Sequence, residues 1–549
     1  MARFLLFVCS GIDKGHRPVP CLWLASKEFV VFSQQGKGRR HLNLIMERNG
    51  TMKGILKRTM TSAAVAALLA SPLAHATNGY FKIGNGTKNK GMAGAGIAFG
   101  QDALAGATNP AALVDIGSRF DAGIELFKPK RKGQVDATGM AVPDLGAGPR
   151  QGVNSSEKSR SNSFLIPSFG VSKAWNDRIT IGLSVTGNGG MNTRYGDANA
   201  GNGNIFTDAF APVVGDTSSS SFQPGPSGFA GFLEMVGGVP AAAMDPNLAS
   251  LYMNQNNTPA LGVNLAQALI APTIAFRINE HHSVGFAPVI GFQSFRAYGL
   301  GLFQGFSSRP DKVTNNGNDT SWGVGARIGY QGDFGRFSFG LSGTSKIYMD
   351  KFDDYAGLFA EKGDFDIPAN FGGGIAFRMT PKLTIAADIS RILYGDVKSI
   401  ANKGPTADEF FSAFTGALVG DPSLNARPLG TNNGYGFGWD DVTVYKIGVN
   451  YDYNSQWTFR AGFNYAEMPY DKDQALFNVL APAVVEKHAT LGFTYSPDKN
   501  AELSVAYMHA FTNDVEYTYN GTGQYTGFSY TAKNRMYQNS VEVSYGWKF

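Results

Sequence analysis

Histidine and cysteine, the side chains most often used for nucleophilic catalysis and metal binding, are sparse in this sequence and are not arranged for either task. Both cysteines, Cys9 and Cys21, lie near the amino end. The histidines beyond residue 76 are His281, His282, His488 and His509. No His-x-x-x-His spacing and no grouping of Ser, His and an acid stands out among them. The sequence therefore predicts no enzyme, no metal site and no cofactor.

Three arginines are better candidates for chemistry because each occupies the polar face of a stretch of alternating polarity. Arg327, Arg378 and Arg460 lie between residues that are apolar or small at every second position. In a strand, such an arginine points to the face opposite the apolar one. Inside a barrel it could bind the carboxylate of a ligand, to which a guanidinium donates two parallel hydrogen bonds. Alternatively, charges on this face form ladders along the wall and hold an internal plug in place. The other charges with this phase are Asp121, Glu125, Arg277, Asp388, Lys446 and Asp452.

The elements that must position these charges are β-strands with one apolar face. Residues 179–186, 322–331, 457–465 and 502–507 all alternate between apolar or aromatic residues and small, polar or charged ones. No run after residue 76 reaches 18 consecutive apolar residues, which a membrane-spanning helix requires. Aromatic residues gather at strand ends, among them Trp175, Tyr348, Tyr451, Tyr453, Tyr470 and Trp547. This pattern is typical of a barrel in the outer membrane, with lipid outside and a polar lumen inside.

Connections between the predicted strands alternate between tight and long. The tight turns are Asn176-Asp177, Glu280-His281, Gly332-Asp333, Thr380-Pro381, Asn454-Ser455 and Pro497-Asp498. The long loops are near 132–159, 196–263, 299–319, 350–363, 399–437, 471–483 and 515–534. These connections separate fourteen antiparallel strands over residues 117–549, an even number with both ends on the tight-turn side. We therefore predict an all-β, 14-stranded transmembrane barrel that crosses the outer membrane of a Gram-negative bacterium many times.

The carboxyl end has the pattern of a closing strand. Apolar or aromatic residues occupy every second position from Val541 to Phe549. A stripe of this kind suits lipid contact. We expect Phe549 to be recognised by the outer-membrane barrel assembly machinery, outer-membrane lipid to surround the apolar face, and the protein to be a monomer.

A secretory signal is predicted inside the numbered chain at residues 46–76. A basic segment from Met52 to Arg58 precedes the apolar run from Met60 to Ala70 and the cleavage site Ala74-His75-Ala76. Residues 1–45 then have no evident role, and we interpret them as a non-native upstream extension. Residues 1–76 hold 11 of the basic and 3 of the acidic residues, so the remaining chain has a formal charge of −3 and no nucleic-acid footprint.

Residues 77–116 suit neither a strand ladder nor an ordinary helix. Eight glycines interrupt the segment, so its backbone can turn sharply and approach other backbone closely. It ends in Asn109-Pro110-Ala111, where proline restricts both its own backbone and that of Asn109. We predict a hatch that fills the barrel lumen and contributes side chains to a substrate pocket. The candidates for that pocket are Phe81, Ile83, Met92, Ile97, Phe99 and Leu104.

The same segment carries a family resemblance. The sequences NGYF, KGMAGAG, DALA and NPA follow one another directly after the predicted signal. In this order they resemble the amino-terminal hatch of FadL-type outer-membrane transporters. The resemblance implies uptake of long-chain fatty acids, or of aromatic or aliphatic hydrocarbons as in some relatives. It also implies an inward kink of the third strand that opens the barrel wall, and Gly187-Asn188-Gly189-Gly190 occupies the matching place. Ordinary fraying of that strand into its loop is the alternative.

Two predicted external loops are unusually hydrophobic. The loop 196–263 contains FAPVV and FAGFLEMV, and the loop 399–437 contains FFSAF. Exposed apolar patches often mark binding surfaces, although these segments could instead pack together as a lid. We therefore expect passive uptake of hydrophobic molecules by loop capture, a hatch-gated pocket and lateral exit through the strand-three opening. A general porin or an adhesin is the rival from another class.

Overall fold

The computed structural model describes residues 78–138, 155–196, 205–206, 260–406, 408–410, 412–413, 416, 421–521 and 529–549, together with two short strands near the amino end. Those two strands, β1 (Leu22–Ala25) and β2 (Glu28–Val31), pair antiparallel in a separate unit that spans residues 1–60. The predicted signal peptide, residues 46–76, lies outside the described residues and stays a prediction.

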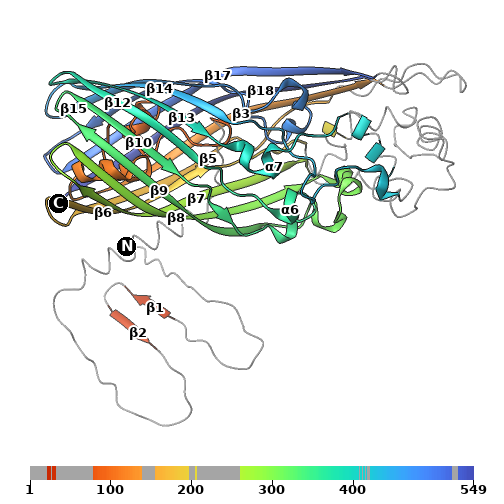
Figure 1. The fold of residues 1–549 in the computed structure, drawn as a ribbon, viewed down its shortest axis with the longest axis horizontal. Coiled ribbons are helices and arrows are strands. Elements are labelled where there is room, and N and C mark those ends of the chain that lie inside the picture. The colour runs from red at the N-terminus through yellow and green to blue at the C-terminus, as the bar shows by residue number, and fades with distance from the viewer. Residues whose placement is uncertain are drawn as a thin grey trace, which may run out of the picture. The chain divides into compact units, whose positions relative to one another are not determined.

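A closed ring of fourteen antiparallel strands forms the second unit (Figure 1). In hydrogen-bonded order the ring contains β3 (Arg119–Thr138), β5 (Phe164–Ala174), β6 (Ile179–Gly189), β7 (Gly262–Arg277), β8 (His282–Tyr298), β9 (Asp319–Asp333), β10 (Phe337–Thr344), β12 (Asn370–Thr380), β13 (Leu383–Ile392), β14 (Val442–Asp452), β15 (Trp457–Ala466), β16 (Lys487–Tyr495), β17 (Ala501–Asn520) and β18 (Ser529–Lys548), which pairs with β3. Two short strands are added, β4 (Ser155–Lys158) on β3 and β11 (Tyr348–Met349) on β9.

The alternation seen in the sequence decides which face of each strand points outward. Val324 and Ile328 on β9 are about two-thirds exposed, whereas Arg327 between them is buried. The same contrast holds on β18, where Val541 and Val543 are exposed and Glu542 is buried. An apolar exterior around a polar interior is therefore built by period-two alternation, as predicted.

Strand boundaries differ from the prediction in three places. The loops expected near 132–159 and 515–534 are partly strand, because β3 continues to Thr138 and β17 to Asn520. The turn expected at Gly332-Asp333 lies after Asp333, since β10 begins at Phe337. The extended strands keep their ladder while their outward residues become polar. Hydrogen bonding between strands does not require apolar side chains. The hydropathy pattern of the sequence therefore indicated where the apolar face ends, and not where the strand ends.

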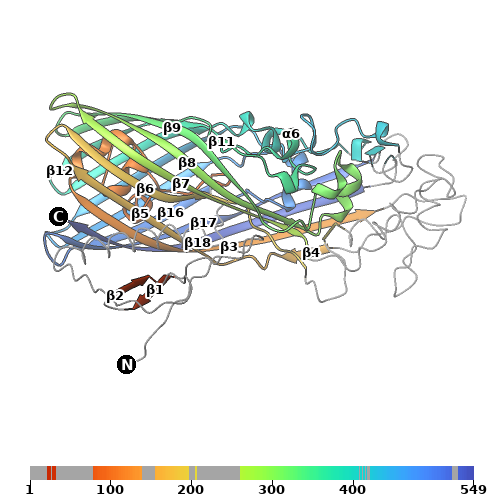
Figure 2. The ribbon, with the colours of Figure 1, turned by 90° about the horizontal axis from the view of Figure 1, so that it is seen from below.

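Residues 78–116 lie inside the ring at the short-turn end, where the chain also ends (Figures 1 and 2). This hatch contains α2 (Thr87–Gly91) and two 3-10 helices, η1 (Ala103–Ala107) and η2 (Pro110–Asp115). Short elements in the connections at the other end are η6 (Gly301–Phe306), η7 (Pro310–Lys312), η8 (Asp353–Tyr355), α6 (Ala360–Gly363), η9 (Tyr394–Asp396), α7 (Lys398–Ala401), η10 (Pro422–Leu424), η11 (Lys472–Gln474) and η12 (Phe477–Val479). A large buried apolar cluster joins these connections to Tyr80 of the hatch.

Candidate functional site

Buried ion pairs attach the hatch to the wall formed by β3 and β18. Lys90 contacts Glu125, and its Nζ lies 3.0 Å from Oε2 of Glu542. Lys82 approaches the same two carboxylates at 3.5 and 3.9 Å. All four side chains are at most 3% exposed. The two inward carboxylates, which would repel each other in an empty lumen, are therefore neutralised by hatch lysines.

A second group of charges fixes the hatch at the closing strands. Lys88 Nζ lies 2.5 Å from Oε2 of Glu502 on β17, and Arg119 lies 2.7 Å from the same oxygen. On β13, Oδ2 of Asp388 accepts hydrogen bonds from the backbone N–H groups of Gly96 and Ile97 at 2.8 and 3.1 Å. Sequence analysis singled out the glycines and apolar residues of the hatch and missed its lysines. The signal was present, because lysines in a segment destined for a lumen require acidic partners.

The Asn109-Pro110-Ala111 turn presses against two inward glycines of the wall. The side-chain amide of Asn109 donates to the carbonyls of Ile97, at 2.7 Å, and of Tyr330, at 3.0 Å. A Cβ on Gly329 would lie 2.0 Å from Oδ1 of Asn109, and one on Gly285 would lie 2.3 Å from the carbonyl carbon of Pro110. No side chain fits at these two wall positions, so the turn seats directly on backbone.

A cavity of about 120 Å³ lies between the hatch and the wall. Arg327 and Lys446 both line it. The Nε of Arg327 donates to Oγ1 of Thr344 at 2.8 Å, and no acidic partner lies within 4 Å of this guanidinium among the described residues. Lys446 stands opposite Asp388 in the β13–β14 register, while that carboxylate accepts hydrogen bonds from the hatch. The cavity therefore holds two cations whose charge is not cancelled by a close ion pair.

The other two arginines predicted to contact a carboxylate lie elsewhere. Arg378 is half-exposed at the short-turn end, where its guanidinium lies 3.6 Å from Asp333. Arg460 is buried beside the hatch and donates to Gln101 at 2.6 Å and to Thr494 at 2.8 Å. Because alternation reports the face but not the height along the strand, it did not separate these three arginines.

The six apolar hatch residues are distributed over several contacts rather than gathered in one pocket. Phe81 and Ile97 line the cavity. Ile83 packs in a cluster with Phe127 and Met508, whereas Met92 and Phe99 pack in another. Leu104 is buried inside the hatch. The cavity itself is lined mainly by polar side chains, whereas all six predicted pocket residues are apolar.

Strand β6 leaves its neighbour β5 at the predicted glycine cluster. The β5–β6 ladder ends at the pair Ser168–Thr186, and the β6–β7 register shifts between Gly187 and Gly189. Beyond that point β6 contacts the hatch, because the carbonyl of Asn188 accepts the N–H of Lys82 at 2.9 Å. A Cβ on Gly189 would lie 1.9 Å from the carbonyl oxygen of Tyr80. The end of β6 is thus paired with β7 and the hatch instead of β5.

Comparison with known proteins identifies a family for the part of the barrel from β7 onward. Residues 248–547 match the family model described as outer membrane protein transport protein (OMPP1/FadL/TodX). The chain belongs to this family. It is accordingly an outer-membrane transport protein for hydrophobic compounds and not an enzyme. The matched residues run from β7 to β18, so the hatch lies outside them.

Solved structures share the fold of this FadL/TodX-family protein at low sequence identity. The toluene transporter TodX of P. putida is 15% identical with a TM-score of 0.53, over 85% of this chain and 99% of the TodX chain. A FadL homologue from Pseudomonas aeruginosa is also 15% identical with a TM-score of 0.53, over 86% of this chain and 100% of its own. No curated protein matches the sequence. At this identity the likeness concerns the fold alone.

The long-loop end of this FadL/TodX-family barrel is filled by aromatic side chains. Phe303 packs edge-on against Phe206 at 5.6 Å and near Phe477 at 5.5 Å, while Phe306 stacks on Phe410 at 5.2 Å. A small cavity of about 40 Å³ among these connections is lined almost entirely by apolar residues. Phe410 belongs to the predicted capture loop 399–437, and most of the other predicted loop, 196–263, lies outside the described residues. The connections at 299–319 and 471–483, which sequence analysis did not select, supply Phe303 and Phe477.

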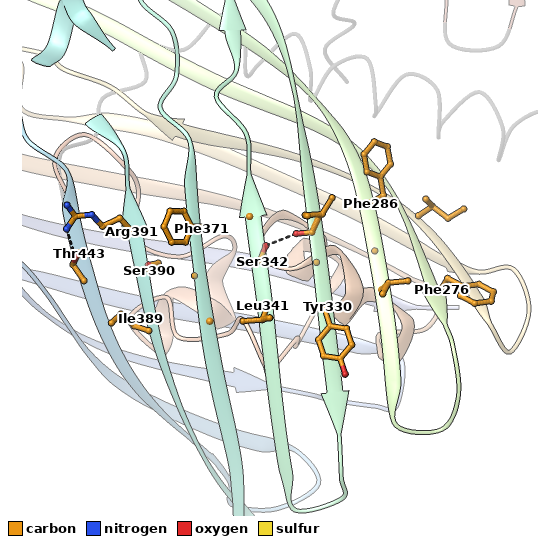
Figure 3. Close-up of a pocket in the computed structure, with 18 residues that line it drawn as sticks. Phe276, Phe286, Tyr330, Leu341, Ser342, Phe371, Ile389, Ser390, Arg391 and Thr443 are labelled. Carbon is orange, nitrogen blue, oxygen red and sulfur yellow. Dashed lines mark hydrogen bonds between the residues drawn. The ribbon is translucent and has the colours of Figure 1, made fainter. Parts of the chain in front are cut away.

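A groove of about 1070 Å³ marks the lipid-facing surface of β7 to β14 (Figure 3). Leu341, Phe371 and Ile389 flank it on neighbouring strands (Figure 3). In the β10–β12 register, Gly373 stands opposite Leu341 and Gly343 opposite Phe371. The groove and the lumen cavity share four lining residues, Ser342, Phe371, Gly372 and Ser390. The wall between lumen and lipid is therefore thin here, because its inward positions carry only glycine and serine.

Helical spans and metal clusters are not found in the part of the chain that the structure describes. No helix there is long and apolar enough to cross a membrane. No group of three His, Cys, Asp or Glu side chains is placed there to hold a metal ion.

Proposed function

We propose that this transporter takes up long-chain fatty acids by passive diffusion. The observation that carries the proposal is the lumen cavity that contains Arg327 and Lys446. A carboxylate between a guanidinium and an ammonium group would gain charge-assisted hydrogen bonds, whereas a hydrocarbon gains nothing from such a cavity. The cavity volume, about 120 Å³, suits a head group and a few carbons rather than a whole fatty acid. The tail must then extend along apolar surface outside the cavity.

Capture is proposed to begin in the aromatic cluster of the external connections. Phe303 and Phe306 are buried at the mouth of the barrel, and the partly exposed rings of Phe410 and Phe477 pack on them. Each methylene moved from water to such a cluster contributes about 0.8 kcal/mol, so a long acyl chain is concentrated there. The cluster is continuous with Tyr80 of the hatch, and this continuity offers a path from loops to cavity.

Release is proposed to occur sideways through the wall between β5 and β6. Thr186 and Asn188, at the point where these strands separate, also line the cavity. A displacement of the hatch at Tyr80 and Lys82, which β6 contacts, would then open a route into the bilayer. The thin wall beside the lipid-facing groove favours a second exit, near Ser342 and Gly372. A lateral route remains downhill for an apolar solute because it ends in lipid.

The rival substrate class is aromatic or aliphatic hydrocarbon. The printed description of TodX names it a toluene transporter, and its fold is shared by this chain. Such a solute would not need Arg327 or Lys446. A general porin or an adhesin is disfavoured by the many hydrogen bonds and ion pairs that hold the hatch in the lumen.

Uptake of labelled oleate and labelled toluene by cells with and without the protein tests the proposal. We expect oleate uptake to require the protein. Removing the cations with Arg327→Gln and Lys446→Gln should weaken oleate binding about ten- to a hundredfold, since each charge-assisted hydrogen bond is worth roughly 1.5–3 kcal/mol. Arg378→Gln is the matched control, because it removes the same charge at the short-turn end. Unchanged oleate binding together with protein-dependent toluene uptake would favour the hydrocarbon class.

Assembly is proposed to follow the rule for single-chain barrels. Phe549 ends the lipid-facing stripe of β18, and its side chain is 59% exposed. It is therefore accessible for recognition by the barrel assembly machinery. Loss of insertion after deletion of residues 545–549, measured by heat-dependent migration on denaturing gels, is the expected outcome. We further propose a monomer, which size-exclusion chromatography with light scattering in detergent would check.

A further inference from the structure

A stripe of lysines follows the lipid-facing residues on the outer face of β3. Ile124 and Leu126 are exposed on this face, and the next three outward positions are Lys128, Lys130 and Lys132. The intervening residues, from Phe127 to Arg131, point inward and are buried. The outward face of one strand thus changes from apolar to basic within a single step of the alternation.

The register of the neighbouring strands shows where this change occurs. Leu126 stands opposite Val541 on β18 and Leu165 on β5, and both of those side chains are exposed and apolar. One step further, Lys128 stands opposite Asn539, and the step after that places Lys130 opposite Tyr537. The apolar row therefore ends on β3 and β18 at the same height. Tyrosine above such a row is typical of the interface between lipid and water.

The direction of the strand assigns this interface to a leaflet. The chain of β3 runs from the short-turn end, where Arg119 lies, toward the long-loop end. Long loops of outer-membrane barrels face the cell exterior. The lysine stripe is therefore at the head-group level of the outer leaflet, rather than in the periplasm.

Among the described residues, no acidic side chain forms an ion pair with the lysines of the stripe. Lys128, Lys130 and Lys132 make no ion pair within 4 Å there, whereas Lys533 nearby pairs with Glu516 at 2.8 Å and with Asp514 at 3.4 Å. Arg535 stands between Lys132 on β3 and Asp514 on β17, so it is not counted in the stripe. On the other side, Lys132 pairs in register with Lys158 of β4. Like charges placed side by side are unfavourable unless an anion bridges them.

We propose that this lysine stripe binds the phosphate groups of a phosphorylated glycolipid in the outer leaflet, while acyl chains of the same lipid pack on Ile124, Leu126 and Leu165. Lysine is a compact charge with three donors and binds phosphate well. Outward positions on a strand are two residues apart, so the stripe from Lys128 to Lys132 spans about 13 Å and can meet more than one phosphate. The site is independent of the substrate that the lumen carries.

Retention of glycolipid by the purified full-length barrel tests the proposal. Native mass spectrometry in detergent would count bound lipid A per barrel for the wild type, for Lys128→Gln/Lys130→Gln/Lys132→Gln, and for the control Lys173→Gln/Lys382→Gln/Lys499→Gln. The control removes the same charge at exposed positions of the short-turn end. We expect the stripe variant to retain at least tenfold less lipid A, and the control to equal the wild type.

Two further arms separate the phosphate from other causes. The wild type should retain dephosphorylated lipid A no better than the stripe variant does. Heat-dependent migration on gels would confirm that each barrel is folded, and the three single lysine variants would replace the triple variant if it did not fold. The proposal would be overturned if a folded stripe variant retained as much phosphorylated lipid A as the wild type does. It would also be overturned if the wild type retained as much dephosphorylated as phosphorylated lipid A.

Discussion

Lys90 of the hatch and Glu542 of the last strand are joined by a buried ion pair, with 3.0 Å between Nζ and Oε2 and at most 1% of either side chain exposed. These residues are far apart in the sequence, because the hatch precedes the first strand of the barrel and Glu542 belongs to the last. The pair therefore couples closure of the barrel by β18 to seating of the hatch. A hatch that moves during transport must keep or replace this contact.

Replacing Lys90 with methionine should loosen the hatch. The substitution leaves two buried carboxylates with one remaining cation, and removing one partner of a buried pair typically costs about 3–5 kcal/mol. Liposome-swelling assays with a small sugar should show increased permeability. Lys398→Met is the control, because it removes a lysine that pairs with Glu361 on the surface. Such surface pairs are worth at most about 1 kcal/mol, so permeability should stay at the wild-type level. A tight Lys90→Met barrel would contradict this role.

Gly329→Val should displace the Asn109-Pro110-Ala111 turn without opening the ladder. Valine suits a strand, but its Cβ would lie 2.0 Å from Oδ1 of Asn109. We expect faster proteolysis within the hatch and greater sugar permeability. Gly343→Val on β10 is the matched control, since the nearest atom to a Cβ there is 3.6 Å away. If both variants behaved alike, the turn would not depend on its glycine seat.

Restoring the β5–β6 ladder should block import. Pro167 is the next residue of β5 in line to pair with β6 beyond Ser168–Thr186, and proline has no N–H to donate. Pro167→Val with Gly187→Val is expected to extend the ladder. Gly189 should be kept, because it contacts Tyr80. The variant should insert normally, bind oleate and fail to transport it. Wild-type transport by this variant would contradict exit between β5 and β6. Exit through the thin wall near Ser342 and Gly372 would then be tested by a disulfide between the opposite residues Gly343→Cys and Phe371→Cys.

Protein extracted from outer membranes should begin at Thr77. The basic, apolar and Ala-x-Ala order of residues 52–76 motivates this expectation. Amino-terminal sequencing checks it. Recovery of peptides from residues 1–45 in that material would show that neither cleavage nor the upstream-extension interpretation is right.

Local patterns were sufficient to predict the class of fold. The alternation around Trp322 and the aromatic end at Phe549 reflect a period of two residues, which each strand expresses by itself. Strand number followed from the rhythm of tight and long connections, because hairpins link neighbours in sequence. The extended tops of β3 and β17 were not predicted, since polar strands outside the lipid band carry no apolar signal.

Assignments inside the lumen depended on contacts between distant residues. Arg327, Arg378 and Arg460 have the same phase in sequence, yet one lines the cavity, one lies at the short-turn end and one contacts the hatch. Their heights depend on cross-strand register, and their partners depend on the path of the hatch through the ring. Sequence by itself determined that this chain forms a filled barrel with an apolar exterior. Only the tertiary structure decided which inward charges pair with the hatch and which remain available to a ligand. The reason is that ion pairs form between side chains that are close in space, whatever their separation in sequence.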